Sequence, residues 1–170
     1  MIRLTGVTSC AVANTEAGSL ALFFSMDSGT SGEWLPCLSV KHGDSATLLA
    51  LNFRDHESAA RSPFLLEGIA DQNCLVLGKA EFYVADLSYL STNRERHLAL
   101  DPRGPAIIGR VNVPNDRPKE GNWLASTGVV ITVDRAVLRP SAWEVGVMNA
   151  AGQFEAVLHF PYAQEHTSRA

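Results

Sequence analysis

Hydrophobic residues recur at every second position along much of the chain, which is the period of a β-strand. One such run holds Leu20, Leu22, Phe24 and Met26. The runs are short because Gly, Ser, Asn, Asp and Pro separate them. The pattern predicts strands near residues 2–12, 19–26, 34–41, 46–54, 64–70, 77–85, 95–100, 107–113, 127–134, 143–148 and 154–160.

Turn and helix signals agree with an all-β chain. Glycines follow His42 and end the segment Asn149–Gly152, and both positions predict hairpin turns. Helix is predicted only as short turns at residues 55–61 and 86–90. Pro36 falls within a predicted strand and indicates a sheet edge or a strand start. The expected fold is therefore an all-β, antiparallel β-sandwich.

Composition narrows the classes of protein. Of the 170 residues, 46% are hydrophobic and 19% are charged, which excludes a disordered chain. The net charge is −4 and no dense cluster of Lys and Arg appears, so duplex nucleic acid is not an expected partner. The same deficit weakens binding to anionic lipid.

Targeting and redox signals are sparse. No apolar run approaches the roughly 20 residues that span a bilayer, and the first residues lack the apolar core of a signal peptide. We therefore expect a cytoplasmic location. The three cysteines Cys10, Cys37 and Cys74 are far apart in sequence and form no CxxC pair. They predict neither a zinc site nor a disulfide framework, and we expect small buried hydrophobes.

The middle of the chain resembles the C2 domain family. Phe64-Leu65-Leu66-Glu67-Gly68-Ile69-Ala70-Asp71 looks like the family's strand that ends in an acidic loop, and Leu77–Leu87 looks like the strand that follows it. Residues 95–101 and 107–113 look like the closing pair of strands. The resemblance implies a C2-like sandwich over residues 1–113, a linker or long loop over 114–122, and additional strands over 123–170 that pack on the same domain.

The chemistry usual in that family is calcium-dependent phospholipid binding through aspartates in loops at one end of the sandwich. The matching positions here are degenerate, because they hold Asn14, Glu16, Asp71 and Asn73, with a single aspartate among them. Calcium takes six to eight oxygen ligands, normally with several carboxylates. We therefore expect no metal and no other cofactor, and the sequence is similar to the family members that serve as docking or scaffolding domains.

Enzyme signals are weak. Cys37, His42 and Asp44 lie close in sequence, and Asp55-His56-Glu57 forms a polar cluster, but neither has the setting of a known nucleophile motif. A solvated turn is the better interpretation of both. The chain also lacks the glycine-rich signatures of nucleotide-binding loops.

Three positions are candidates for contact with a partner. Arg94 and Arg96 belong to a short charged run on a predicted strand edge, which is more typical of a solvated face. Trp123 follows the polar linker and either packs on its own domain or forms an exposed anchor. Trp34 and Trp143 lie in strand patterns and are expected to be core or half-buried.

The function that the sequence favours is non-catalytic docking to another protein in the cytoplasm, within a larger assembly. One alternative is a peripheral phospholipid-binding module, which would need a basic concave face or apolar loop tips. A second is a self-assembling viral or structural β-sandwich subunit. A third is a small β-sandwich enzyme, which would need a pocket holding converging titratable groups.

Overall fold

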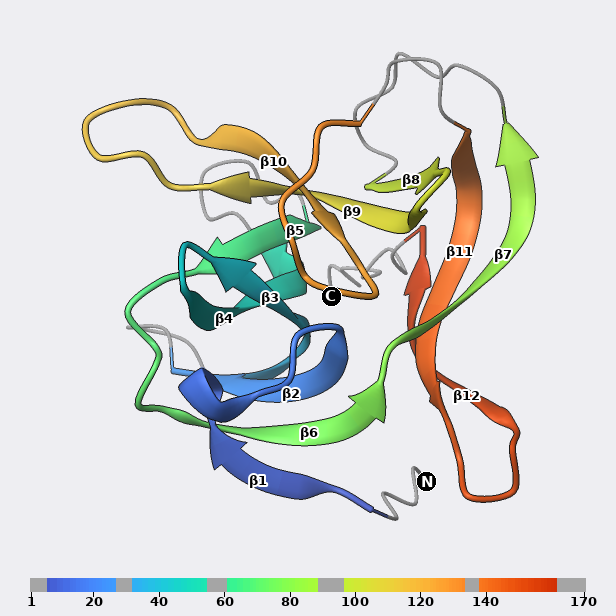
Figure 1. The fold of residues 1–170 in the computed structure, drawn as a ribbon, viewed down its shortest axis with the longest axis horizontal. Helices are drawn as coiled ribbons and strands as arrows, with labels where there is room; N and C mark the ends of the chain where they lie inside the picture. The colour runs from blue at the N-terminus through green and yellow to red at the C-terminus, as the bar shows by residue number, and fades with distance from the viewer. Residues whose placement is uncertain (1–5, 27–31, 55–60, 89–96, 134–137, 162–170) are drawn as a thin grey trace, which may run out of the picture.

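The computed structural model describes residues 6–26, 32–54, 61–88, 97–133 and 138–161, and these residues form an all-β fold (Figure 1). A single 3₁₀ turn, η1 (Val12–Asn14), interrupts the strands. The strands are β1 (Thr8–Ala11), β2 (Ser19–Ser25), β3 (Glu33–His42), β4 (Ser45–Arg54), β5 (Arg61–Leu66), β6 (Asn73–Lys79), β7 (Glu81–Ser88), β8 (Leu98–Asp101), β9 (Gly104–Val111), β10 (Lys119–Leu124), β11 (Arg139–Met148) and β12 (Phe154–Phe160). Within the described ranges, no helix is long and apolar enough to cross a membrane.

The larger of the two sheets is mixed. Eight of its nine described strands follow the order β1-β6-β2-β3-β4-β5-β9-β10, and the ninth, β8, pairs with β9. All of its ladders are antiparallel except the contact of β5 with β9, where Phe64 faces Arg110 in parallel. The expectation of a purely antiparallel sandwich is therefore wrong at this point. Three strands separate β5 from β9 along the chain, and a connection of that length allows a parallel return.

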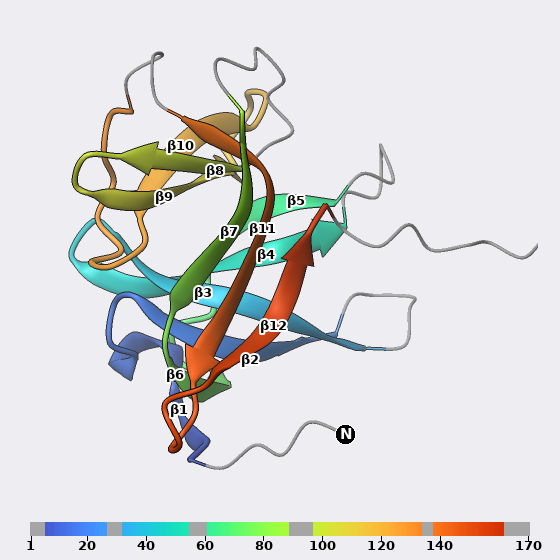
Figure 2. The ribbon, with the colours of Figure 1, turned by 90° about the vertical axis from the view of Figure 1, so that its right-hand side faces the viewer.

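The smaller sheet has the order β12-β11-β7 and covers one face of the larger sheet (Figure 2). The predicted strand 77–85 is in fact two strands, because β6 belongs to the larger sheet and β7 to the smaller one. The chain changes sheet at Ala80, two residues after Gly78, whose φ is +146°. Glycine adopts this backbone conformation without the steric cost that a side chain would bring.

A backbone contact also joins the larger sheet to the segment that leads into the smaller sheet. Leu100 of β8 forms an isolated antiparallel bridge with Leu138, and the Leu100 amide donates to the Leu138 carbonyl over 2.9 Å. A second connection is the chain itself, which passes from β6 of the larger sheet into β7 of the smaller sheet. The two sheets are therefore linked at two places, and one core lies between them.

The main core lies between the two sheets and contains two tryptophans. Trp123 and Trp143 are each 1% exposed. Trp143 stacks on Phe160 of β12, with ring centroids 5.5 Å apart and planes inclined by 14°. The expectation that Trp143 is a core residue is confirmed.

A second core lies on the opposite face of the larger sheet. Phe23, Leu35 and Leu48 are buried there beneath η1 and Ile69. All three cysteines belong to this core, with Cys37 and Cys74 buried and Cys10 partly exposed. Burial of Cys37 and Cys74 matches the sequence expectation.

The predicted linker 114–122 is only partly a loop. Its last residues begin β10, which pairs antiparallel with β9 and places Trp123 opposite Ile107. Gly121 makes this possible, because a Cβ at that position would lie 2.6 Å from the Trp123 ring. Residues 114–118 therefore connect the two strands of a hairpin.

Two further secondary-structure predictions are wrong. Asp86, Leu87 and Ser88 lie in β7 rather than in a helical turn, because pairing with β11 satisfies their backbone groups. The rest of that predicted turn, and residues 55–60 of the other one, lie outside the described residues. The second wrong prediction is the strand over residues 127–134. In the described part of that range, the only ladder contact is a bridge from Val130 to Trp123.

The predicted hairpin turns are confirmed. Gly43 has a φ of +62° and connects β3 to β4. The Asn149 side chain caps the other turn by accepting from the amides of Ala151 and Gln153. The prediction that Pro36 marks a sheet edge or a strand start is wrong, because Pro36 lies inside β3, between β2 and β4. The strand tolerates proline there because Pro36 pairs with Leu22 of β2, while the ladder to β4 begins one residue later at Cys37.

Candidate functional site

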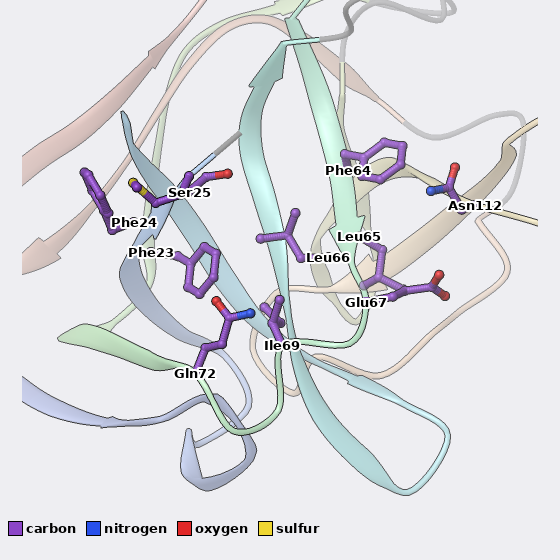
Figure 3. Close-up of a pocket in the computed structure, with 11 residues that line it drawn as sticks. Phe23, Phe24, Ser25, Phe64, Leu65, Leu66, Glu67, Ile69, Gln72 and Asn112 are labelled. Carbon is purple, nitrogen blue, oxygen red and sulfur yellow. The ribbon is translucent and has the colours of Figure 1, made fainter. Parts of the chain in front are cut away.

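A hollow of about 470 Å³ opens on the face of the larger sheet that carries the second core (Figure 3). Phe23 of β2 and Phe64 of β5 form its two sides, and Leu66 and Ile69 lie between them. Phe64 is held in place by stacking on Phe53, with centroids 4.9 Å apart. The hollow therefore has aromatic sides, although polar groups make up slightly more than half of its accessible lining.

The strands β3 and β4, which lie between β2 and β5, pair Cys37 with Ala50 on this face. Both residues are fully buried in the second core, and neither lines the hollow. The walls of the hollow are therefore formed by residues of β2 and β5 and by the segment that carries Ile69 and Gln72.

The polar part of the lining includes four polar side chains. Ser25, Gln72 and Asn112 contribute uncharged groups, and Glu67 is the single ionisable residue of the lining. Glu67 Oε1 lies 3.8 Å from His42 Nε2, and both side chains are about half exposed. A solvated contact of this kind contributes little to stability. The lining itself thus holds a single titratable side chain, and its mixture of polar and apolar groups suits a ligand that carries both.

An exposed apolar cluster adjoins the hollow at the end of the β2–β3 hairpin, and we call Phe24, Met26 and Trp34 the hairpin-end patch. Their exposed fractions are 40%, 79% and 52%. Phe24 and Trp34 are cross-strand partners whose ring centroids lie 5.2 Å apart. Gly32 lets this cluster form, because a Cβ there would collide with the Phe24 ring.

The patch is the uncovered continuation of the main core. Leu20 and Leu38 pair on the same face of the hairpin and are fully buried. Figure 2 shows β2 and β3 projecting beyond the smaller sheet at one end. The smaller sheet therefore covers the first pair and leaves Phe24 and Trp34 exposed.

The hollow and the patch meet along β2. Phe23 points into the hollow and Phe24 points away from it (Figure 3). Phe24 and Met26 contribute to the lining as well as to the patch. The two features are therefore contiguous, with Phe24 and Met26 at their shared edge.

Of the three predicted partner-binding residues, the structure describes Trp123, which lies in the main core. Trp123 is 1% exposed and packs in its own domain, so it is not an exposed anchor. Its Nε1 has no hydrogen-bond partner in the described part of the chain. Arg94 and Arg96 lie outside the described residues.

The degenerate loop positions do become neighbours. The Val12 amide donates to the Gln72 carbonyl over 2.8 Å, which brings the segment carrying Asn14 and Glu16 beside the segment carrying Asp71 and Asn73. The structure thus joins these two loops at one end of the larger sheet. In the described ranges, no three His, Cys, Asp or Glu side chains are grouped so that they could hold a metal ion.

The polar cluster around Cys37 is not assembled into a nucleophilic site. Cys37 is fully buried in the second core, and its thiol donates to the Leu35 carbonyl over 3.3 Å. Burial raises the pKa of this thiol far above its usual value, and the neighbouring Cys74 adds to that effect. His42 and Asp44 lie at the exposed β3–β4 turn. Residues 55–57 lie outside the described residues.

Sequence reasoning missed the residues that shape this surface. Phe23 and Phe64 appear in the sequence as ordinary members of hydrophobic strands. Trp34, which the sequence predicts to be core or half-buried, is 52% exposed. The local pattern does not reveal which strands lie side by side, and that arrangement brings these residues to one surface. No protein-family model, no curated protein and no solved structure matches this chain.

Proposed function

We propose that this chain is a non-catalytic docking domain that binds another protein through the hairpin-end patch. The observation that carries the proposal is the exposure of Trp34, with 52% of its surface open beside Phe24 and Met26. Tryptophan is enriched among the residues that dominate binding energy, and aromatic residues and methionine are enriched at interfaces. Exposure of a tryptophan, a phenylalanine and a methionine side by side costs free energy in water, and a bound partner would remove that cost.

The adjoining hollow suggests the chemistry of the partner. A volume of about 470 Å³ admits one large apolar side chain with its neighbouring backbone. Phe23 and Phe64 would flank such a side chain, while the patch would contact the segment beside it. The partner that fits best is a protein segment presenting a leucine or an aromatic residue next to groups that can hydrogen-bond to the polar part of the lining.

We also propose that the fold is a C2-like β-sandwich. A degenerate C2-like sandwich is supported by the sequence pattern of residues 64–113, and a docking role in the cytoplasm within a larger assembly is what that resemblance implies. The peripheral lipid module and the self-assembling subunit use the same exposed surface, so they are alternative outcomes of one experiment.

The test compares Trp34→Ala with Tyr83→Ala. Tyr83 is a matched control because it is an aromatic residue, 57% exposed, on a strand of the smaller sheet. Tagged wild-type and variant proteins are incubated with cell extract, and bound proteins are quantified by mass spectrometry. The top candidate is then purified and titrated by calorimetry. We expect at least a tenfold loss of affinity for Trp34→Ala and no change for Tyr83→Ala.

Three outcomes would contradict the proposal. Equal affinity of both variants would remove the patch from the interface. Pelleting of purified protein with acidic vesicles, lost in Trp34→Ala, would replace protein docking with lipid binding. A solution mass that rises with concentration, and falls to the monomer mass in Trp34→Ala, would identify a second copy as the occupant.

A further inference from the structure

Cys10 and Cys74 lie directly opposite each other on adjacent antiparallel strands. The ladder of β1 and β6 pairs Ser9 with Leu75, Cys10 with Cys74, and Ala11 with Asn73. Paired residues project from the same face of a sheet, and both thiols enter the second core. The Cys74 thiol is in hydrogen-bonding contact with Cys10. The fold thus brings Cys10 and Cys74, which are far apart in sequence, next to each other.

The position of this pair in the ladder defines its geometry. The Val12 amide bonds to the Gln72 carbonyl, and hydrogen-bonded pairs alternate along an antiparallel ladder. Cys10 and Cys74 therefore form a hydrogen-bonded pair, for which the Cα separation is about 5.5 Å. That value lies within the range of roughly 4.4–6.8 Å found for disulfides.

The side-chain separation is less ideal. Opposed Cβ atoms on paired strands lie about 4.5–5.5 Å apart, whereas a disulfide brings them to about 3.5–4.5 Å. Closing the bond requires a small approach of β1, which ends the strand order of the larger sheet and is paired there with β6 alone. A disulfide closed under strain is more easily reduced than a relaxed one.

We propose that Cys10 and Cys74 form a reversible disulfide site, closed by a small-molecule disulfide such as oxidised glutathione and reopened by thiols. This modification is independent of the docking function. It would fasten the edge strand β1 to β6, and the loop it closes would restrict the unfolded chain. The third cysteine, Cys37, stays reduced because it is fully buried and bonded to the Leu35 carbonyl.

The chemistry proceeds by two thiol–disulfide exchanges. The partly exposed Cys10 thiolate attacks one sulfur of oxidised glutathione, forming a mixed disulfide and releasing one glutathione thiolate. Cys74 then loses its proton and attacks the Cys10 sulfur, releasing the second glutathione. The protein is oxidised by two electrons, and one oxidised glutathione becomes two reduced ones.

The second exchange is the slower one. In the reduced protein, burial first and Cys10 second raise the pKa of Cys74 to about 11. The burial persists after Cys10 has been joined to glutathione, so the Cys74 thiolate stays scarce at neutral pH. The mixed disulfide on Cys10 therefore accumulates before the internal bond closes.

The test uses the full-length protein incubated with oxidised glutathione, then alkylated and analysed by intact mass and non-reducing peptide mapping. We expect one free thiol out of three, a Cys10–Cys74 cross-link, and a higher urea midpoint that returns to its starting value after reduction. Cys37→Ser should form the same cross-link, whereas Cys10→Ser and Cys74→Ser should not.

Persistence of three free thiols in the wild-type protein would overturn the proposal, and so would a cross-link involving Cys37. Arrest at the mixed disulfide would also overturn it, since the internal bond would then be unattainable. Peptide mapping of the wild-type protein decides each case without reliance on the folding of a variant.

Discussion

His97 is a single residue whose burial sets a dependence of stability on pH. Burial lowers its pKa from 6.5 to about 4, and the positive charge of Arg110 acts in the same direction. The ring packs edge-on against Phe160, with centroids 5.7 Å apart. The folded protein therefore holds His97 neutral at pH values where the unfolded chain is protonated.

Because the pKa of His97 is lower in the folded protein, the free energy of unfolding falls as the pH falls. Stability from neutral His97 is fully present above the unfolded pKa and is lost as the pH falls toward the folded value. Between pH 7 and pH 5 we expect a loss of about 2 kcal/mol in the free energy of unfolding from this residue. His97→Gln should flatten that part of the profile in urea titrations. Parallel profiles for the two proteins would show that His97 is not responsible.

Trp143 offers a second residue-scale prediction. Its Nε1 is buried without a hydrogen-bond partner in the described ranges, so removing the N–H breaks no bond there. Trp143→Phe should lower the free energy of unfolding by about 1–2 kcal/mol, because the phenyl ring fills less of the core than the indole ring. Trp143→Ala should lower it by about 3–5 kcal/mol. Chemical denaturation measures both. Equal costs would indicate that the indole nitrogen makes a stabilising contact.

At the scale of elements, the contact of β11 with β12 depends on Gly146. The register shifts between Val145 and Gly146, and a Cβ at Gly146 would collide with the carbonyl of Glu155 on the neighbouring strand. Gly146→Ala should therefore push β12 away and destabilise the fold by about 3 kcal/mol.

Gly152 in the turn of the same hairpin is the matched control. Its φ is +74° and a Cβ there would meet nothing within 4 Å. Gly152→Ala should cost about 1 kcal/mol, from backbone strain alone. Urea unfolding gives both values, and a smaller cost at Gly146 than at Gly152 would mean that the collision relaxes freely.

Strand pairing also explains which elements the sequence could predict. The hydrophobic runs of β2, β4 and β12 lie close to their predicted ranges. The centres of β2 and β4 are buried on both faces, so their hydrophobic residues follow one another directly and mark the strands clearly. The β6–β7 strand was predicted as one element, since a change of sheet at Ala80 leaves the alternation unbroken. The strand β10 was missed because its residues before Trp123 are polar or glycine, and its pairing with β9 is a tertiary contact.

For the whole molecule, the shared core predicts cooperative unfolding. Side chains from both sheets meet in one cluster, among them Leu38 and Leu49 of the larger sheet and Val145 of the smaller. Neither sheet buries its inner face without the other, so residues 123–161 should not unfold separately from residues 6–113.

Fluorescence and circular dichroism test this expectation. Trp34→Phe leaves Trp123 and Trp143 as the emitting residues, and both are in the core between the sheets. We expect the fluorescence transition in urea to coincide with the transition in far-ultraviolet circular dichroism. Two separate transitions would show that the sheets are independent units.

The sequence by itself determined the all-β class, most strand positions and the hairpin turns, because alternation and turn chemistry are local properties. The tertiary structure decided how those strands are ordered, and with that the parallel contact of β5 and β9 and the pairing of Cys10 with Cys74. It also decided that the smaller sheet covers Leu20 but not Phe24. Both residues satisfy the same local pattern, and only the extent of the opposing sheet separates a core position from a binding surface.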